Sequence, residues 1–87
     1  MPHFQAKVSV RLRSSVLDPA GEATKSAANR LGIQGISNLR IGKLIELDIE
    51  ASHENEARAR LELLSDRLLA NPVIEDWRLE LAISSSS

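Results

Sequence analysis

The sequence contains no cysteine, only two aromatic residues and almost no net charge, and each of these absences excludes a class of protein. Without cysteine the chain can form neither a disulfide scaffold nor a thiolate metal site, and it has no cysteine nucleophile. Its 11 basic and 12 acidic residues argue against general affinity for nucleic acid or anionic membranes. No apolar run approaches the roughly 20 residues of a membrane span, and no signal-peptide core is evident, so we expect a cytoplasmic protein.

What remains is a short chain with an aliphatic core. Its 87 residues, 43% of them apolar, suit one small domain, which we place at residues 1–83, followed by a flexible serine tail at 84–87. A domain of this size buries only about 60–65% of its unfolded surface, so association with a second copy would bury more. Because Phe4 and Trp77 are the only aromatic residues, aliphatic side chains and alanine must fill the core.

Alternation of apolar and polar residues predicts four strands. This period of two is typical of a strand with one buried face, and it occurs at residues 4–13, 36–41, 43–50 and 74–83. The second stretch is imperfect, because Ile36 and Leu39 are three positions apart, which suggests a bulge. Gly42 separates the second stretch from the third, so we expect a hairpin there, with Arg40 and Lys43 as two cations at its tip.

Two helices are predicted between these strands. Asp18 is a preferred N-cap and Pro19 suits the first helical position, so the first helix begins there and runs to about Leu31, with Gly32 following as the C′ residue. Small residues dominate its inward stripe, which is Ala20, Ala23, Thr24, Ala27, Ala28 and Leu31. Ser52 is the expected cap of the second helix, which ends before Pro72. Its apolar seam is Ala57, Leu61, Leu64 and Leu68.

The predicted element order is β-α-β-β-α-β, which indicates an α+β fold. Because every strand has one apolar face, both helices must cover the same side of an antiparallel sheet. We therefore expect a two-layer, ferredoxin-like sandwich with a four-stranded antiparallel sheet and both helices on one face.

No group of residues is spaced for catalysis or metal binding. His3 and His53 are the only histidines, and neither has a second ligand at helix or strand spacing. The alternate carboxylates Glu46, Asp48 and Glu50 are more simply a solvated or paired strand face than a cation site. The glycines form no phosphate-binding loop. We therefore expect no catalytic residue, no metal and no cofactor bound by this chain alone.

Two functions that sandwiches of this kind can have do not fit the sequence. An acylphosphatase-like enzyme needs an anion-binding loop after the first strand, but Arg13 leads there to the apolar Val16 and Leu17. An RNA-recognition sandwich needs exposed aromatic residues on its central strands, and the polar positions here carry none. Two interpretations of Arg40 and Lys43 stay open: they keep a hairpin soluble, or they contact a partner or a phosphate.

Three stretches together resemble the PurS family, the small subunit of phosphoribosylformylglycinamidine synthase. They are Val16-Leu17-Asp18-Pro19 with Gly21, Arg40-Ile41-Gly42-Lys43 with Ile45-Glu46-Leu47, and the run LLANPVIEDW, which includes Asn71, Pro72, Glu75, Asp76 and Trp77. Their order and spacing match over residues 4–83. The sequence departs from the usual family residue at Ser15, Ala20, Asn38, Ser65 and Trp77, and none of these changes removes a catalytic group.

The resemblance implies a non-catalytic subunit of a carbon–nitrogen ligase complex of purine biosynthesis, with glutamine as the amido donor. In that family a glutaminase subunit releases ammonia, and a large synthetase subunit uses ATP and Mg to activate formylglycinamide ribonucleotide, which ammonia converts to the amidine. The small subunit associates with itself as a dimer or tetramer, bridges the other two and assists ammonia transfer. The alternative is a ferredoxin-like regulatory module that binds a small ligand at its dimer interface, which a thermal-shift screen would reveal.

Overall fold

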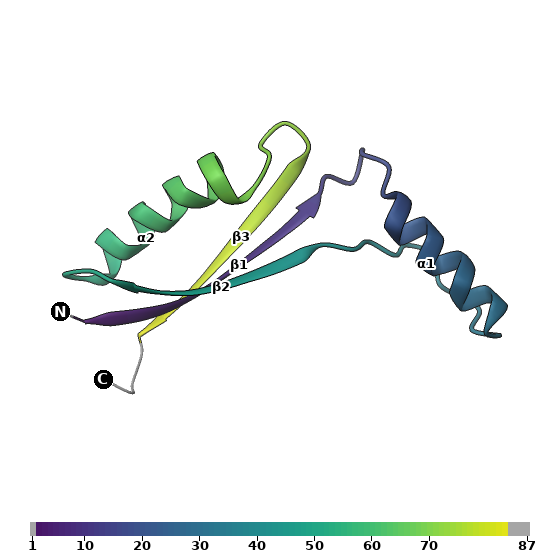
Figure 1. The fold of residues 1–87 in the computed structure, drawn as a ribbon, viewed down its shortest axis with the longest axis horizontal. Coiled ribbons are helices and arrows are strands. Elements are labelled where there is room, and N and C mark those ends of the chain that lie inside the picture. Colours follow the sequence, from purple (N-terminus) through teal and green to yellow (C-terminus); the bar gives the residue numbers. More distant parts are fainter. Residues whose placement is uncertain (1, 84–87) are drawn as a thin grey trace.

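The computed structural model describes residues 2–83 and contains a three-stranded antiparallel sheet with one helix packed on it and another standing away from it (Figure 1). In chain order the elements are β1 (His3–Leu12), α1 (Pro19–Arg30), β2 (Lys43–Glu50), α2 (Glu54–Leu64), the π-helical turn η1 (Ser65–Leu69) and β3 (Glu75–Ile83). The strand order is β2-β1-β3. The predicted α+β class is confirmed, and the predicted tail lies outside the described residues.

The alternating sequence of β1 gives the sheet one buried face. Four of its inward residues are at most 2% exposed, and they are Phe4, Ala6, Val8 and Val10. Val8 lies opposite Ile45 on β2 and Leu79 on β3, so the alternation continues in register across the three strands. The core therefore runs along β1, the central strand.

The helix α2 and the turn η1 cover this apolar face (Figure 1). Ala57 and Leu61 of α2 are fully buried, as the predicted seam requires. The predicted seam does not continue to Leu68, which is 74% exposed. The wider π geometry of η1 shifts the inward positions, so Ser65 and Leu69 point toward the sheet instead. The Ser65 hydroxyl is satisfied within the helix, where it donates to the Leu61 oxygen at 2.7 Å.

His53, and not the expected Ser52, caps the N-terminus of α2. The His53 Nδ1 atom accepts a hydrogen bond from the Glu56 main-chain N–H at 3.2 Å. Ser52 instead donates its hydroxyl to the Glu56 carboxylate at 2.8 Å, and this hydrogen bond contributes most to lowering the pKa of Glu56. The two residues thus divide the roles of a capping box between them.

The predicted fourth strand and the placement of both helices on one face are wrong. Residues 36–41 pair with no strand of the sheet, and α1 projects beyond the end of the sheet (Figure 1). We call residues 13–42 the arm. In the stripe predicted to pack on the sheet, only Ala27 and Ala28 are even half-buried, because α1 lies where this sheet cannot cover it. A periodic stripe shows that a helix has an apolar side, but not which surface that side meets.

The predicted hairpin at Gly42 is also wrong. Among the described residues, positive φ angles occur at Gly32 (85°) and Gly35 (91°), and the chain reverses at this tip of the arm. Gly42 directly precedes β2 in an extended chain. Arg40 and Lys43 consequently do not share a hairpin tip.

The arm makes the molecule unusually extended. Its dimensions are 52 × 30 × 15 Å and its radius of gyration is 16.8 Å, whereas a compact chain of this length would have a radius of about 12 Å. The accessible surface is 6,224 Å², against about 5,000 Å² for a compact protein of this mass. A single copy therefore leaves much of its surface unburied.

Candidate functional site

Several candidate residues from the sequence meet at the neck of the arm, where residues 13–18 leave the sheet and residues 38–42 return to it. Arg40 joins these two segments. Its Nη2 atom donates to the main-chain oxygens of Arg13 at 2.7 Å and Val16 at 2.8 Å. The residue is half-buried, so these charge-assisted hydrogen bonds form partly out of water, where they are strong. Arg40 therefore holds the neck closed.

Asp18 connects the same two segments from the other side. It is only 4% exposed, and its two carboxylate oxygens accept from the main-chain N–H groups of Gly21 at 2.9 Å and Ile41 at 2.8 Å. The first bond caps α1, and the second ties the start of α1 to the returning chain. The hydrogen bonds from Ile41 and Gly21, helped by the charge of Arg40, lower the pKa of the Asp18 carboxyl.

Acid is expected to loosen the neck. Because the pKa of Asp18 is lowered in the folded protein, its charge stabilises folding above the unfolded-state value of about 3.9. That contribution is lost as the pH falls through the lower folded value. The melting temperature, measured from neutral to acid pH, should therefore fall more steeply in the parent than in Asp18→Asn, which keeps a capping oxygen without the charge. Parallel profiles would show that the charge of Asp18 has no such role.

Two glycines let the backbone segments approach closely at the neck. A Cβ atom on Gly21 would lie 2.3 Å from the main-chain oxygen of Leu39, and one on Gly42 would lie 2.4 Å from that of Val10. Cβ atoms do not approach backbone oxygens so closely, so any larger residue must push these segments apart. Both glycines of the family motif are therefore required for close approach, and neither for a positive φ.

Lys43 lies apart from Arg40. It opens β2 directly opposite Val10, so it belongs to the sheet face that carries the core residues, and it is exposed at the end of that face. Within residues 2–83 its side chain makes no hydrogen bond or ion pair. Whether it contacts a partner stays a prediction.

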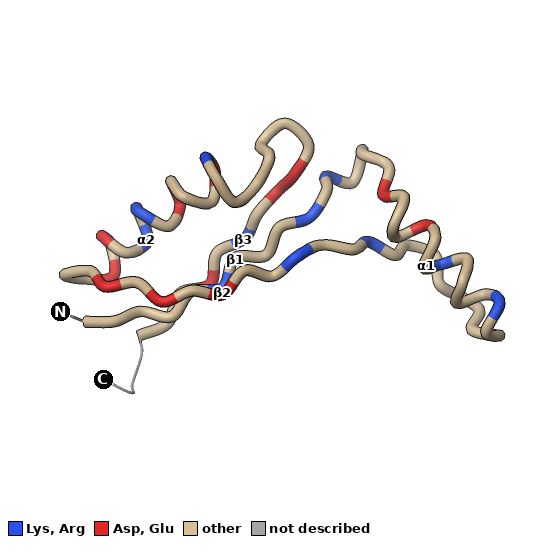
Figure 2. The backbone as a smooth tube through the Cα atoms, in the orientation of Figure 1, with Lys and Arg blue, Asp and Glu red and all other residues tan. Residues whose placement is uncertain are grey.

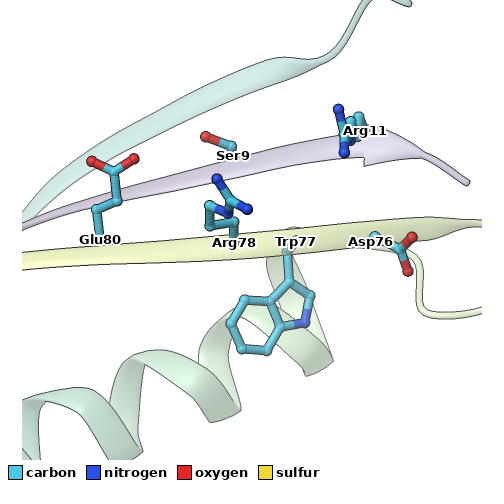
Figure 3. A pocket seen from close by; sticks show the side chains of 6 residues that line it. All are labelled: Ser9, Arg11, Asp76, Trp77, Arg78 and Glu80. Carbon is cyan, nitrogen blue, oxygen red and sulfur yellow. The ribbon is translucent and has the colours of Figure 1, made fainter.

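The motif Asn71 to Trp77 forms the turn from η1 into β3. The Asn71 side chain accepts from the Val73 N–H at 3.0 Å, and the Glu75 carboxylate accepts from the Asn71 N–H at 2.7 Å. Asn71 and Glu75 thus satisfy the backbone of the turn. Trp77 points from β3 toward η1 and packs against the core cluster that contains Val10 (Figure 3).

Arg13 fastens this turn to the end of β1. Its Nη2 atom donates to the Pro72 oxygen at 2.5 Å, and its Nε atom lies 3.3 Å from the Asp76 carboxylate. Pro72 and Asp76 are therefore engaged within the chain. The sequence pattern did not reveal this pairing, since Arg13 is far from both residues in the chain.

The open face of the sheet carries a polar groove that sequence reasoning missed. The groove has a volume of about 370 Å³ and is lined on this face by Ser9, Arg11, Asp76, Arg78 and Glu80 (Figure 3). A second hollow of about 210 Å³ continues from Arg11 and Asp76 to Arg40 at the neck. The sequence does show alternate polar positions on β1 and on β3. It does not show the register of the two strands, which determines that these residues lie next to one another in the groove.

The acidic residues of β2 form a separate stretch of the same face. Glu46, Asp48 and Glu50 follow one another along the strand (Figure 2), and Glu50 lies 3.4 Å from His3. Among residues 2–83 no group of three or more histidine and carboxylate side chains is placed to hold a metal ion. In the same range neither helix has the length and apolarity to cross a membrane.

Comparison with known proteins agrees with the sequence motifs. The family model described as PurS, phosphoribosylformylglycinamidine (FGAM) synthase, matches residues 5–83. The chain belongs to the PurS family. It is similar to the PurS subunit of Synechocystis sp., with 47% identity over 90% of this chain and 78% of the relative. It also resembles the Mycobacterium leprae subunit, with 44% identity over 86% of this chain and 91% of the relative.

Solved PurS structures share the fold. The PurS chain in the structure of PurLQS from Thermotoga maritima is 32% identical and superposes with a TM-score of 0.87 over 94% of this chain and 100% of that chain. Bacillus subtilis PurS is 39% identical, with a TM-score of 0.81 over 91% and 98% of the two chains. Superposition at this level over nearly the whole chain includes the arm, so the arm is a feature of PurS folds.

Proposed function

We propose that this chain is the non-catalytic small subunit of phosphoribosylformylglycinamidine synthase and joins its synthetase and glutaminase subunits. The observation that carries the proposal is the family match over residues 5–83, together with the likeness to a chain of the T. maritima PurLQS complex. The solved Methanocaldococcus jannaschii relative is described as one of the subunits of formylglycinamide ribonucleotide amidotransferase in purine biosynthesis. ATP and Mg would be used by the larger subunits, and this chain would assist the transfer of ammonia between them in the cytoplasm.

The geometry of the neck supports a scaffolding role. Its charged residues, Asp18 and Arg40, bind main-chain groups of this chain and so fix the path of the backbone at the neck. Engaged in this way, the two side chains are not placed to act as an acid–base pair on a substrate. Lys43 and Gly42, together with the guanidinium edge of Arg40, remain our candidates for contact with a partner subunit or a phosphate.

Reconstitution of the complex tests this function. The synthetase and glutaminase subunits, mixed with ATP, Mg, glutamine and formylglycinamide ribonucleotide, should form the amidine only when this chain is added. The chain alone should hydrolyse neither ATP nor glutamine. Ammonia supplied directly should bypass the requirement, because transfer of ammonia is the step that assembly serves. Equal glutamine-dependent synthesis with and without the chain would overturn the proposal.

We further propose that two copies associate through their arms. Four apolar residues of the arm are more than 40% exposed, namely Leu17, Leu31, Ile33 and Ile41. The apolar residues of β2 that face the core are only half-buried, and they are Ile45, Leu47 and Ile49. The arm of a second copy would cover the apolar residues of β2 that the chain's own α1 leaves partly exposed. Exchange of an identical element between two copies in this way is domain swapping.

Sedimentation should therefore give a dimer or larger species at micromolar concentration. Leu31→Asp places a charge on the arm beside α1 and should shift the mass toward the monomer, because burying an unpaired charge is costly. The control is Leu68→Asp, since Leu68 is 74% exposed and Leu31 78% exposed, but Leu68 lies on η1. A parent that sediments as a monomer would contradict the proposed association.

A further inference from the structure

The cations on the open face of the sheet differ in whether the chain supplies a partner. Lys7 lies in register between Glu46 on β2 and Glu80 on β3, so two carboxylates flank it. Arg13 is paired with Asp76. Within residues 2–83 the side chains of Lys7, Arg11 and Arg78 form no ion pair, but only Arg11 and Arg78 have no free carboxylate directly opposite them in the sheet.

The register explains why these two arginines are left over. Arg11 lies opposite Asp76, but that carboxylate is engaged by Arg13 at 3.3 Å. Arg78 lies opposite Ser9, which has a hydroxyl in place of a carboxylate. Arg11 and Arg78 are diagonal neighbours on adjacent strands, about 7–8 Å apart at their backbones by sheet geometry. Asp76 and Glu80 lie on either side of Arg78 along the same face of β3, but within residues 2–83 neither forms an ion pair with Arg11 or Arg78. A carboxylate from outside the chain would reduce the repulsion between the two arginines.

Figure 3 shows Ser9 beside Arg78 on the neighbouring strand and Arg11 farther along β1, with all three side chains on the side of the strands opposite to Trp77. A guanidinium binds a carboxylate through two parallel N–H donors, and a serine hydroxyl adds a third. From this we infer that Ser9, Arg11 and Arg78 bind carboxylate groups on an acidic surface of a partner subunit. The inference rests on the proposed function, because it assigns a contact within that assembly.

The form of the groove favours a protein over a free anion. Sites for small ligands are concave and enclose most of the ligand. This groove lies on an open sheet face, and both edges of β1 are paired, so its main-chain N–H groups are engaged in the sheet. A free phosphate would stay largely hydrated there. A protein surface would exclude water from the arginines, and such desolvated arginines contribute strongly to binding at interfaces.

Binding to the two larger subunits, measured by calorimetry, tests the inference. Arg11→Ala and Arg78→Ala should each weaken assembly roughly tenfold or more, since a hydrogen-bonded charge is lost at the interface. Lys7→Ala is the matched control. It removes a cation from the same face and the same strand as Arg11, but one already flanked by carboxylates, so its effect should be much smaller. All three variants should keep the parent's melting temperature, because these side chains are exposed.

The outcomes separate the possible failures. If the parent assembles and both arginine variants assemble with the same affinity, the inference is overturned and the proposed function stands. If the parent itself does not assemble, the proposed function fails and the inference fails with it. A second measurement titrates the isolated chain with inorganic phosphate while the Arg11 and Arg78 side chains are followed by NMR. Saturation at millimolar phosphate, with unchanged assembly of the variants, would instead assign the groove to a free anion.

Discussion

Arg40→Ala should lower the free energy of unfolding by about 2 kcal/mol and loosen the arm. The substitution removes two hydrogen bonds shorter than 3 Å and leaves the main-chain oxygens of Arg13 and Val16 without their charged donor. Because Arg40 joins the outgoing and returning segments of the neck, dimer formation should weaken as well. Urea unfolding gives the free energy, and sedimentation gives the mass.

Lys43→Ala is the control for this experiment. Lys43 is the other cation that the sequence places at the same hairpin tip, but its side chain makes no hydrogen bond or ion pair within residues 2–83. A solvated cation changes stability by no more than about 0.5 kcal/mol when it is removed. A small loss of unfolding free energy in both variants would mean that Arg40 is only a solubilising surface charge. A large loss in Arg40→Ala alone would establish that Arg40 holds the two segments of the neck together.

Gly21→Ala should destabilise the protein, although the same change in an ordinary exposed helix stabilises it by up to about 1 kcal/mol. The sign is reversed because the added Cβ would lie 2.3 Å from the Leu39 oxygen and 3.0 Å from the Asp18 carboxylate. Forcing these groups apart should cost about 1–3 kcal/mol, as overpacking does elsewhere. It should also lengthen the Asp18 hydrogen bonds that close the neck.

A control for the Gly21 change is available within the same helix. Ser26 is exposed on α1, so Ser26→Ala should be neutral or stabilise by up to about 0.5 kcal/mol. Both variants are compared with the parent by urea unfolding. An increase in stability for Gly21→Ala would mean that the neck is more open than the structure has it.

Local patterns in the sequence were sufficient for most elements. The alternation of β1 and β2 and the Asp18–Pro19 start of α1 each lie within a few residues, and all three are found where they were predicted. These signals are reliable because strand faces and helix caps depend on neighbouring residues. The cap of α2 was displaced by one residue, to His53, because serine and histidine can each accept the capping hydrogen bond.

The arrangement of the elements could not be obtained in the same way. The apolar stripe of α1 predicts that the helix packs on the chain's own sheet, yet α1 lies beyond the end of that sheet. The difference depends on contacts between Asp18 and Ile41 and between Arg40 and Val16, which are remote in sequence and have no local signature. Gly42 misled for a related reason, since a glycine needed for close approach looks the same in sequence as a glycine needed for a turn.

The candidate site was only partly visible for similar reasons. Arg40, Gly42 and Lys43 were identified from the sequence, but as one cationic tip. The structure separates Arg40, which binds carbonyl oxygens, from Lys43, which lies opposite Val10. The groove around Arg11 and Arg78 depends on strand register, which follows from the fold and not from either strand alone.

The strand order β2-β1-β3 also determines how this chain must fold. In the part of the chain that the structure describes, the sheet contains no hairpin, and even its pair nearest in sequence, Val10 with Lys43, is separated by the whole arm. β1 is synthesised before both of the strands that pair with it. Its two edges can form hydrogen bonds only after two long loops have closed, and closing each loop has an entropic cost. Sheets built only from such distant pairs form late and slowly, over milliseconds to seconds. The helices can form locally long before that, so closure of the sheet around β1 should limit the rate of folding.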